Sequence, residues 1–349
     1  MTERVLTHVK LILAVLFPLV DAELFTAYLL GLIQDERRFS VLGLSRKTEK
    51  YGPGHLYRVL QMRINWEKIF YTFARPFLQF GKWYLIVDAS PLEQKFAKFR
   101  IAKHGHVSTS GKKNVPQNQV VSLILTNGLI QIVLDYRIWV SPKVAQAKDY
   151  KKLTLLAFEL IKRFHFLKLP VREILFDNYF ASKPIIKWLN HNGYHWTTRL
   201  KANRTIYMNG QASPLSAMNL KPGEHIVAEL KGIEGDVRIL CLLYQNETVY
   251  VATNNVDLDG GGLEQSYRLR WLIEVFHREA KQQFGLEYLW MRNYRALYNH
   301  VGFVCLAYSI LSCLRHSHSV TIGDIKRQIQ DELYSFRDGI DRFANFLAA

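Results

Sequence analysis

The sequence has few cysteines and no long run of apolar residues. Its three cysteines lack the spacing of a zinc site, and three thiols cannot form a disulfide framework. The longest candidate for a membrane span, 301–314, covers 14 residues, which is too short to cross a bilayer and suggests a buried helix instead. Pro18 interrupts the apolar stretch 11–20, which makes it a poor signal peptide. These absences disfavour a secreted or membrane protein and favour a cytoplasmic one.

Acidic residues are also scarce. Lys and Arg number 46 against 30 Asp and Glu, a formal net charge of +16 in 349 residues, which indicates a polyanionic partner, most simply nucleic acid. No Asp or Glu occurs from Gln94 to Leu134, where the basic residues are Lys95, Lys98, Arg100, Lys103, Lys112 and Lys113. This composition predicts a mobile basic loop between strands that binds a phosphate backbone. A solvated loop without a partner is the alternative.

Residues 1–80 are predicted to form a helical domain. Apolar positions recur every three or four residues in the segments Val5–Leu16, Ala22–Ile33, His55–Met62 and Trp66–Phe77. Arg46 and Arg58 fall around a turn between short helices, which is compatible with a helix-turn-helix that contacts DNA. A small helical bundle with a basic face is the alternative.

From Lys82 the period changes, and the pattern predicts an α/β fold with a mixed sheet flanked by helices. Expected strands are 82–87, 118–126, 129–140, 173–176 and 194–200, with helices at 152–166 and 182–190 and an Asn127-Gly128 hairpin turn. Strands at 225–229, 236–244 and 248–253 follow, then a long helix from about 263 and helices at 296–314 and 320–333. The predicted division is therefore 1–80, a catalytic region 81–200, a β-rich insertion 201–254, a second catalytic part 255–315, and C-terminal helices 316–349.

Four polar residues recur at fixed steps in the long helix. Tyr267, Arg270, Glu274 and Lys281 are separated by three, four and seven positions. At about 100° per residue they fall within roughly 60° of one another on a helix. A carboxylate flanked by two cations suits a site that holds a metal and a phosphate. A solvated face with an intrahelical Arg270–Glu274 ion pair explains the spacing equally well.

Two predicted strands end in an aspartate. Asp88 follows Leu85-Ile86-Val87, and Asp177 follows Ile174-Leu175-Phe176. Aspartates at the carboxyl ends of parallel strands point into the crevice where α/β proteins bind ligands, although an Asp can also cap a turn. Together with Glu274 they offer three hard oxygen ligands, which suits Mg²⁺ or Mn²⁺.

At these residues the sequence resembles the DDE transposases of bacterial insertion sequences that carry a Tyr-Arg-Glu-Lys signature. Every interval from Tyr267 to Lys281 matches, and Asp88 and Asp177 stand at the expected strand ends. The resemblance implies a ribonuclease H-like catalytic domain in which Asp88, Asp177 and Glu274 hold two Mg²⁺ or Mn²⁺ ions. It implies that Tyr267, Arg270 and Lys281 contact phosphates, and we expect further DNA contacts from Lys112, Lys113, Arg46 and Arg58.

The resemblance also implies a function and partners. They are cut-and-paste transposition with strand cleavage and strand transfer, acting on double-stranded DNA with terminal inverted repeats and on a DNA target. A homodimer in a synaptic complex and a bacterial, nucleoid-associated location are implied as well. A catalytically silent DNA-binding relative and a ribonuclease H-like structure-specific nuclease are the alternatives. The predicted insertion contains no Trp to stack on a flipped base, and Tyr207, Tyr244 or Tyr250 would have to replace it.

Overall fold

The computed structural model describes residues 22–34, 40–46, 50–79, 81–93, 103–107, 112–141, 150–244, 246–287, 293–315 and 319–334. At residues 22, 103–107, 112–116 and 330–334 only the backbone is described. The predicted helix Val5–Leu16 and the apolar stretch 11–20 lie outside the described residues.

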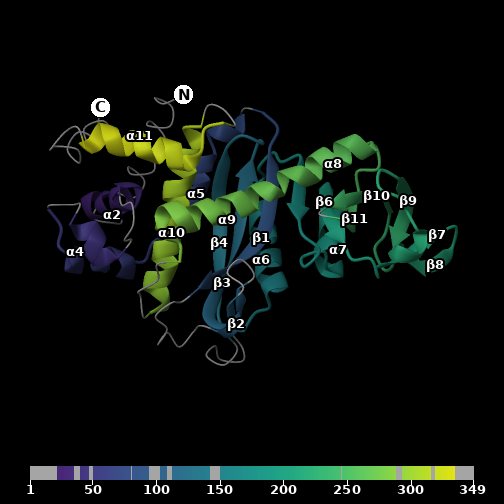
Figure 1. Cartoon of the computed structure of the whole chain (residues 1–349), viewed down its shortest axis with the longest axis horizontal. Helices are drawn as coiled ribbons and strands as arrows, with labels where there is room; N and C mark the ends of the chain where they lie inside the picture. Colours follow the sequence, from purple (N-terminus) through teal and green to yellow (C-terminus); the bar gives the residue numbers. More distant parts are fainter. Residues whose placement is uncertain are drawn as a thin grey trace.

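A mixed sheet forms the centre of the molecule (Figure 1). Before the β-rich segment, the sheet includes β1 Tyr84–Glu93, β3 Lys112–Thr126, β4 Gln131–Trp139, β5 Glu173–Phe176 and β6 Trp196–Leu200. The spatial order is β4-β3-β1-β5-β6, with β1, β3 and β4 antiparallel and β5 and β6 parallel to β1. The mixed α/β architecture, a large sheet with flanking helices, is consistent with a ribonuclease H-like fold and confirms the predicted fold class.

The β-rich segment continues this sheet. Its strands are β7 Thr205–Met208, β8 Gln211–Pro214, β9 His225–Leu230, β10 Asp236–Tyr244 and β11 Glu247–Thr253, with a short 3₁₀ turn at Leu215–Met218. Strand β11 pairs antiparallel with β6, so the described strands join in one sheet of eleven. The three predicted strands of this segment are present, whereas β7 and β8 were not predicted.

The prediction of a mobile basic loop is wrong for residues 103–107 and 112–117, which lie in strands. Strand β2, Lys103–Val107, pairs antiparallel with the first half of β3, so Lys112 and Lys113 lie in a strand. Antiparallel pairing uses backbone groups alone, and a polar segment without apolar alternation can therefore extend a hairpin. That is why the apolar pattern did not reveal it.

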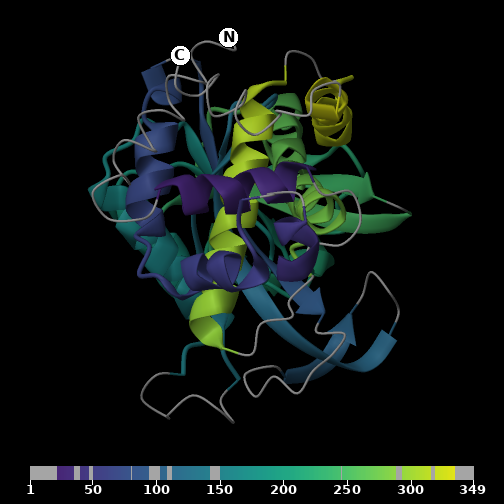
Figure 2. The same cartoon turned by 90° about the vertical axis from the view of Figure 1, so that its left-hand side faces the viewer.

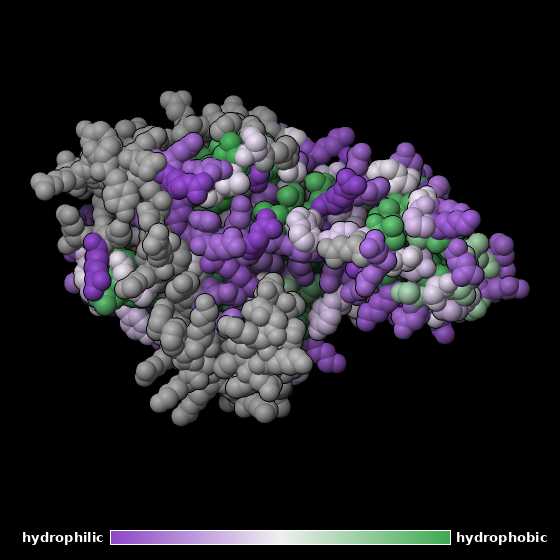
Figure 3. Space-filling view, in the orientation of Figure 1, coloured by the Kyte–Doolittle hydropathy of each residue, from purple (hydrophilic) through white to green (hydrophobic). Residues whose placement is uncertain are grey.

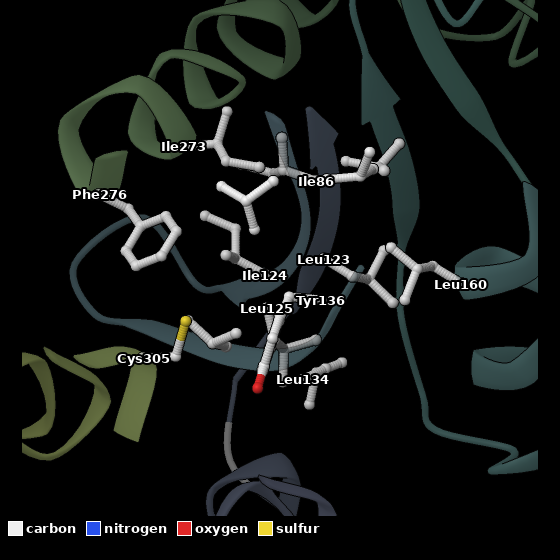
Figure 4. Packing of buried hydrophobic residues seen from close by; sticks show 14 of the residues in the cluster. Ile86, Leu123, Ile124, Leu125, Leu134, Tyr136, Leu160, Ile273, Phe276 and Cys305 are labelled. Atoms are coloured by element: carbon white, nitrogen blue, oxygen red, sulfur yellow. The ribbon is translucent and has the colours of Figure 1, made fainter. Parts of the chain in front are cut away.

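Helices cover both faces of the sheet. Helix α6, Leu153–Phe166, packs on one face, and α5 Trp66–Ala74, α9 Trp271–Phe284 and α10 Tyr294–Cys313 pack on the other. In Figure 4, Leu123 of β3 lies beside Leu160 of α6, while Ile124 lies on the side of Ile273 and Phe276. Successive residues of a strand point to opposite faces, and this alternation divides the core into two layers.

Helix α10 is long and apolar enough to cross a membrane, yet 17 of its residues are buried. It lies between the sheet and the N-terminal helices α2 Ala22–Gln34 and α4 Pro53–Gln61 (Figure 2). Its burial confirms the prediction of a core helix at this position. On the face shown in Figure 3, hydrophilic residues cover most of the described surface and hydrophobic ones form small patches.

The remaining helices are short connectors or flank this core. They are α3 Val41–Ser45, α7 Lys183–His191, α8 Gly260–Leu269, α11 Ile322–Tyr334 and a 3₁₀ turn at Phe77–Gln79. Ser40 caps α3 by accepting the amide of Gly43, and Asn65 caps α5 by accepting the amide of Lys68. The three predicted N-terminal helices within the described residues are confirmed to within a few positions.

Candidate active site

Strand pairing brings the two aspartates together. Val87 of β1 pairs in parallel with Phe176 of β5, so Asp88 and Asp177, the next residue of each strand, lie at the same edge. The prediction that β1 ends at Asp88 is wrong, because β1 continues to Glu93 through its pairing with β3. The pairing of β1 with β3 continues past Asp88, whereas its pairing with β5 ends at Val87. Asp88 therefore has no β5 residue paired with it.

The direction of Asp88 follows from strand alternation. Ile86 lies on the α9 side of the sheet, and Asp88, two residues later, points to the same face. Asp88 Oδ1 accepts the amide of Ala89 at 2.7 Å, which orients the carboxylate. Asp177 is fixed by a turn, since its Oδ1 accepts the amide of Tyr179 at 2.8 Å. The turn-capping interpretation of Asp177 is thus correct and is compatible with a second role.

The predicted long helix is two helices that meet at Arg270. Arg270 ends α8 and precedes Trp271, the first residue of α9. Its amide donates to Tyr267 O at 3.0 Å, a tighter turn than an α-helix makes. The helix is therefore interrupted inside the signature, although Arg270 still contacts both Tyr267 and Glu274.

Arg270 connects the acidic groups. Its Nη2 lies 2.5 Å from Glu274 Oε1, and its Nη1 lies 3.8 Å from Asp88 Oδ2. The guanidinium carbon lies 5.4 Å from the centre of the Tyr267 ring, within cation–π range. The expected Arg270–Glu274 ion pair is therefore present, and it forms beside Asp88 rather than on an open helix surface.

The charges at this edge are not balanced. Burial and the negative charge of Asp177 raise the pKa of Asp88 to about 7, although Arg270 and the Ala89 amide oppose the change. Glu274 adds a further negative influence on Asp88. Burial lowers the pKa of Arg270, but Tyr267, Glu274 and Asp88 outweigh it, and the net pKa lies above the usual value. Asp88 therefore faces an excess of negative charge.

Lys281 lies further along β1. Its Nζ donates to Pro91 O at 2.7 Å and lies 2.9 Å from Glu287 Oε1. Pro91 is three residues beyond Asp88 in β1, so Lys281 contacts the same strand whose Asp88 lies near Arg270. The structure describes no contact between Lys281 and the three carboxylates.

The donor set suits a divalent cation. Among the described residues no three His, Cys, Asp or Glu side chains lie close enough to form a ready metal cluster. Asp88 nevertheless experiences the charges of both Asp177 and Glu274, and the guanidinium of Arg270 lies against two of the three carboxylates. The three carboxylates supply hard oxygen ligands and an excess of negative charge, and Mg²⁺ or Mn²⁺ would neutralise that charge. These residues therefore fit such an ion.

The other predicted DNA contacts lie apart from these carboxylates. Arg46 follows α3 and Arg58 lies on α4, and both are exposed. The side chains of Lys112 and Lys113 lie outside the described residues. Tyr250 is only 6% exposed and cannot stack on a base, whereas Tyr244 is 48% exposed.

Three groups near the site were not predicted. Buried Glu173 accepts the hydroxyls of Thr197 and Ser266, and buried His277 lies 3.2 Å from Ser122, which pairs with Asp88. Trp271, directly after Arg270, is 45% exposed. No periodic signal marks a single polar residue in a buried strand or helix, and for Trp271 the only sequence signal is an aromatic beside a signature position.

A comparison with known protein families agrees with this geometry. A family model described as "Transposase DDE domain" matches residues 79–310. Among solved structures, the NurA nuclease from Sulfolobus solfataricus is 10% identical over 73% of this chain and 85% of its own, with a TM-score of 0.29. Endonuclease V from Bacillus subtilis is 13% identical over 73% of this chain and 94% of its own, with a TM-score of 0.27. No curated protein gives a significant match.

Proposed function

The chain belongs to the transposase DDE domain family, and from this premise we propose that it is a DNA transposase that cuts and rejoins DNA strands. One observation carries the proposal. Asp88 and Asp177 follow paired residues of two parallel strands, and Glu274 and Arg270 of the adjoining helices act on Asp88. Carboxylates that act on one another, with a cation beside them, are suited to metal-assisted phosphoryl transfer.

The proposed cofactor is a pair of Mg²⁺ or Mn²⁺ ions, which Asp88, Asp177 and Glu274 would hold. When bound, such ions activate an attacking oxygen and stabilise the leaving oxygen in a displacement at phosphorus. No nucleophilic side chain is needed for this chemistry. The protein's own part is to place Asp88 and Asp177 at one edge of the sheet, with Glu274 and Arg270 of the adjoining helices acting on Asp88.

The cations of the site are suited to bind the DNA. Arg270 presents a guanidinium that is only 12% exposed and that can donate to a phosphate oxygen beside Asp88. Tyr267 lies against this guanidinium and limits its movement. Lys281 offers a second positive charge along β1. These residues orient the scissile phosphate and offset negative charge as it develops.

The proposed substrates are double-stranded transposon ends with terminal inverted repeats and a target DNA. We propose that two copies of the chain act together in a synaptic complex. The place of action would be the bacterial cytoplasm, in association with the nucleoid. The excess of Lys and Arg supports a DNA partner, since each neutralised phosphate releases counterions.

The test uses purified protein, Mg²⁺ and a duplex taken from the DNA that flanks its gene. We expect Asp88→Asn, Asp177→Asn and Glu274→Gln each to reduce strand cleavage at least about 10³-fold, because each removes a charged oxygen ligand. DNA binding measured in EDTA should persist. Glu264→Gln is the matched control, since Glu264 pairs with exposed Arg268 on α8 and does not contact Asp88.

Strand transfer separates a transposase from a nuclease. A transposase joins the cut end to a target plasmid, whereas a structure-specific nuclease only cuts, and a silent DNA-binding protein does neither. Wild-type levels of cleavage by any of the three carboxylate variants would contradict the assigned site. Cleavage without end joining would leave the site intact and refute the transposase activity.

A further inference from the structure

The outward face of helix α6 carries apolar residues near both of its ends. On the inward side of the helix, Leu160 lies beside Leu123 of β3 (Figure 4). On the outward side, Leu155 is 42% and Phe166 is 79% exposed. Phe166 is the most exposed large hydrophobic side chain in the described part of the chain. Single exposed apolar residues are common on protein surfaces, so the residues around these two decide whether they mark an interface.

Two charged residues stand between them on the same face of the helix. Leu155, Glu159, Lys162 and Phe166 are separated by four, three and four positions. At about 100° per residue they fall within roughly 60° of one another, and we call this set the α6 stripe. The side chain of Glu159 is 29% exposed, and Lys162 is partly exposed. The steps are the same in both directions along the helix, with apolar residues at the ends and opposite charges in the middle.

A second copy of the chain is complementary to this stripe. If two α6 helices lie antiparallel about a two-fold axis midway between Glu159 and Lys162, Leu155 lies opposite Phe166 of the second copy. Glu159 then lies opposite Lys162 of the second copy, and the symmetry forms each pair twice. A parallel arrangement would instead place each charge opposite the same charge, which is unfavourable. The stripe therefore fits an antiparallel partner with its own sequence.

Contacts within one copy leave both charges able to form these pairs. Lys151 Nζ lies 2.7 Å from Glu159 Oε1. This ion pair is exposed and contributes little to stability, and a carboxylate can accept more than one donor. The Lys162 ammonium lies 4.5 Å from the centre of the Phe158 ring, a contact that leaves its charge available to a carboxylate.

We propose that the α6 stripe joins two copies of the chain in the absence of DNA. Helices α6 and α9 pack on opposite faces of the sheet, so the carboxylates beside α9 remain accessible in such a dimer. A 14-residue helix is about 21 Å long, which makes the contact smaller than a standard interface, and we expect a dissociation constant on the order of 10 µM. The dimer involves neither metal nor DNA, and the inference is therefore independent of the proposed function.

Charge reversal tests the proposed pairs. Sedimentation velocity over a range of about 1 to 200 µM, without DNA and in EDTA, gives the dissociation constant. We expect K162E and E159K each to weaken association at least about 10-fold, because each places like charges opposite each other twice. The double variant E159K/K162E restores opposite charges and should associate within about threefold of the wild type. Lys221→Glu is the control, because Lys221 is exposed in the β-rich segment and lies outside the stripe.

Disulfide cross-linking tests the orientation of the two helices. Oxidation of L155C/F166C should join two copies covalently, because positions 155 and 166 face each other across the two-fold axis. Either single variant should not cross-link, since its two introduced thiols would lie about 16 Å apart along the helices, beyond the reach of a disulfide. The native cysteines are buried, and the wild type is the negative control.

Thermal unfolding midpoints close to the wild-type value would show that the variants fold. The inference is overturned if the wild type stays monomeric at the highest concentration, or if the double charge variant associates as weakly as the single ones. Cross-linking of a single cysteine variant would also overturn it. The strand-cleavage assay decides the proposed function separately, since a monomer that cuts DNA would refute the α6 dimer alone.

Discussion

At the scale of single residues, the negative charge of Asp88 lowers the stability of the fold that positions it. Its pKa is raised from 3.8 to about 7, chiefly by burial and by Asp177. The folded protein therefore retains a proton that the unfolded chain releases near pH 4. The resulting stabilisation is complete below pH 4 and disappears as the pH rises through 7. Each pH unit in this window lowers the free energy of unfolding by about 1.4 kcal/mol at most.

Replacing Asp88 by Asn should therefore stabilise the protein above pH 7 when no divalent metal is present. Asn keeps the oxygen that accepts the Ala89 amide and removes the unfavourable charge. We expect a gain on the order of 1–3 kcal/mol at pH 8 in EDTA, and no gain near pH 4. Urea unfolding at the two pH values measures the difference.

Exposed Asp236→Asn on β10 is the control for the general effect of removing a carboxylate. Added Mg²⁺ should raise the unfolding midpoint of the wild type and not that of Asp88→Asn, because the ion binds only the folded state. An Asp88→Asn protein that is less stable than the wild type at pH 8 would show that the Asp88 charge is compensated, and the argument from burial would be wrong.

The sequence pattern marks the charged residues of the candidate site but not the side chains that they contact. Asp88, Asp177 and Glu274 were selected as candidates because an Asp after an apolar strand and a fixed helical spacing both leave a pattern. The contact of Arg270 with Asp88 was not predictable, since it depends on how α9 lies on β1. Glu173 and His277 were missed because one buried polar group does not alter the apolar period around it.

At the scale of elements, a buried carboxylate fixes α8 to the sheet. Glu173 of β5 is 2% exposed and accepts hydrogen bonds from Thr197 of β6 and Ser266 of α8. Ser266 precedes Tyr267, so the position of Tyr267 depends on this anchor. Glu173→Ala should lower the free energy of unfolding by about 2–4 kcal/mol, because it leaves two buried hydroxyls without an acceptor.

Chemical denaturation measures that effect, with Ser216→Ala on the exposed turn after β8 as the control. Glu173→Gln keeps an acceptor oxygen and should lose less than half as much stability as Glu173→Ala. Equal losses in the two variants would mean that the anchor depends on the carboxylate charge or on packing rather than on the hydrogen bonds.

The contact between α5 and α10 requires a glycine. A Cβ on Gly302 would lie 2.2 Å from Cε2 of Trp66, whose indole donates to Asn299 of the same helix at 2.9 Å. Gly302→Ala should therefore displace Trp66 and lower the free energy of unfolding by about 2–4 kcal/mol, at the upper end of overpacking costs. Thermal unfolding and the proteolysis rate of the N-terminal helices are the measurements.

Gly54→Ala is the matched control, because a Cβ at Gly54 on α4 meets nothing within 4 Å. It should be neutral or stabilising by up to about 1 kcal/mol, since Ala restricts the unfolded chain. If Gly302→Ala is as stable as the wild type, α5 and α10 must be able to move apart without a loss of folding free energy. Their packing would then contribute little to the stability of the core.

At the scale of the whole molecule, the sheet does not stop at the predicted insertion boundary. The apolar period indicated strands between 201 and 254 but not their partner, because pairing between distant strands leaves no trace in a local pattern. Strand β11 pairs with β6, and α8 packs on both. Leu240, Val251 and Leu263 form a small cluster of their own, with Tyr267 packed against it. The β-rich segment therefore supports a signature residue of the site.

This arrangement predicts that the β-rich segment cannot be removed as an independent unit. Replacing 202–251 by a short Gly-Ser linker would expose the edge of β6 and uncover Leu263 on α8. We expect a protein that aggregates and lacks a cooperative thermal transition, as judged by size-exclusion chromatography and circular dichroism. Replacing only 205–214, the β7–β8 hairpin, keeps the β6–β11 pairing and should give a folded, soluble protein of lower stability. A soluble, cooperatively unfolding protein after the larger deletion would instead identify 201–254 as a separable insertion, and Tyr267 would have to be positioned by Glu173 and Arg270 alone.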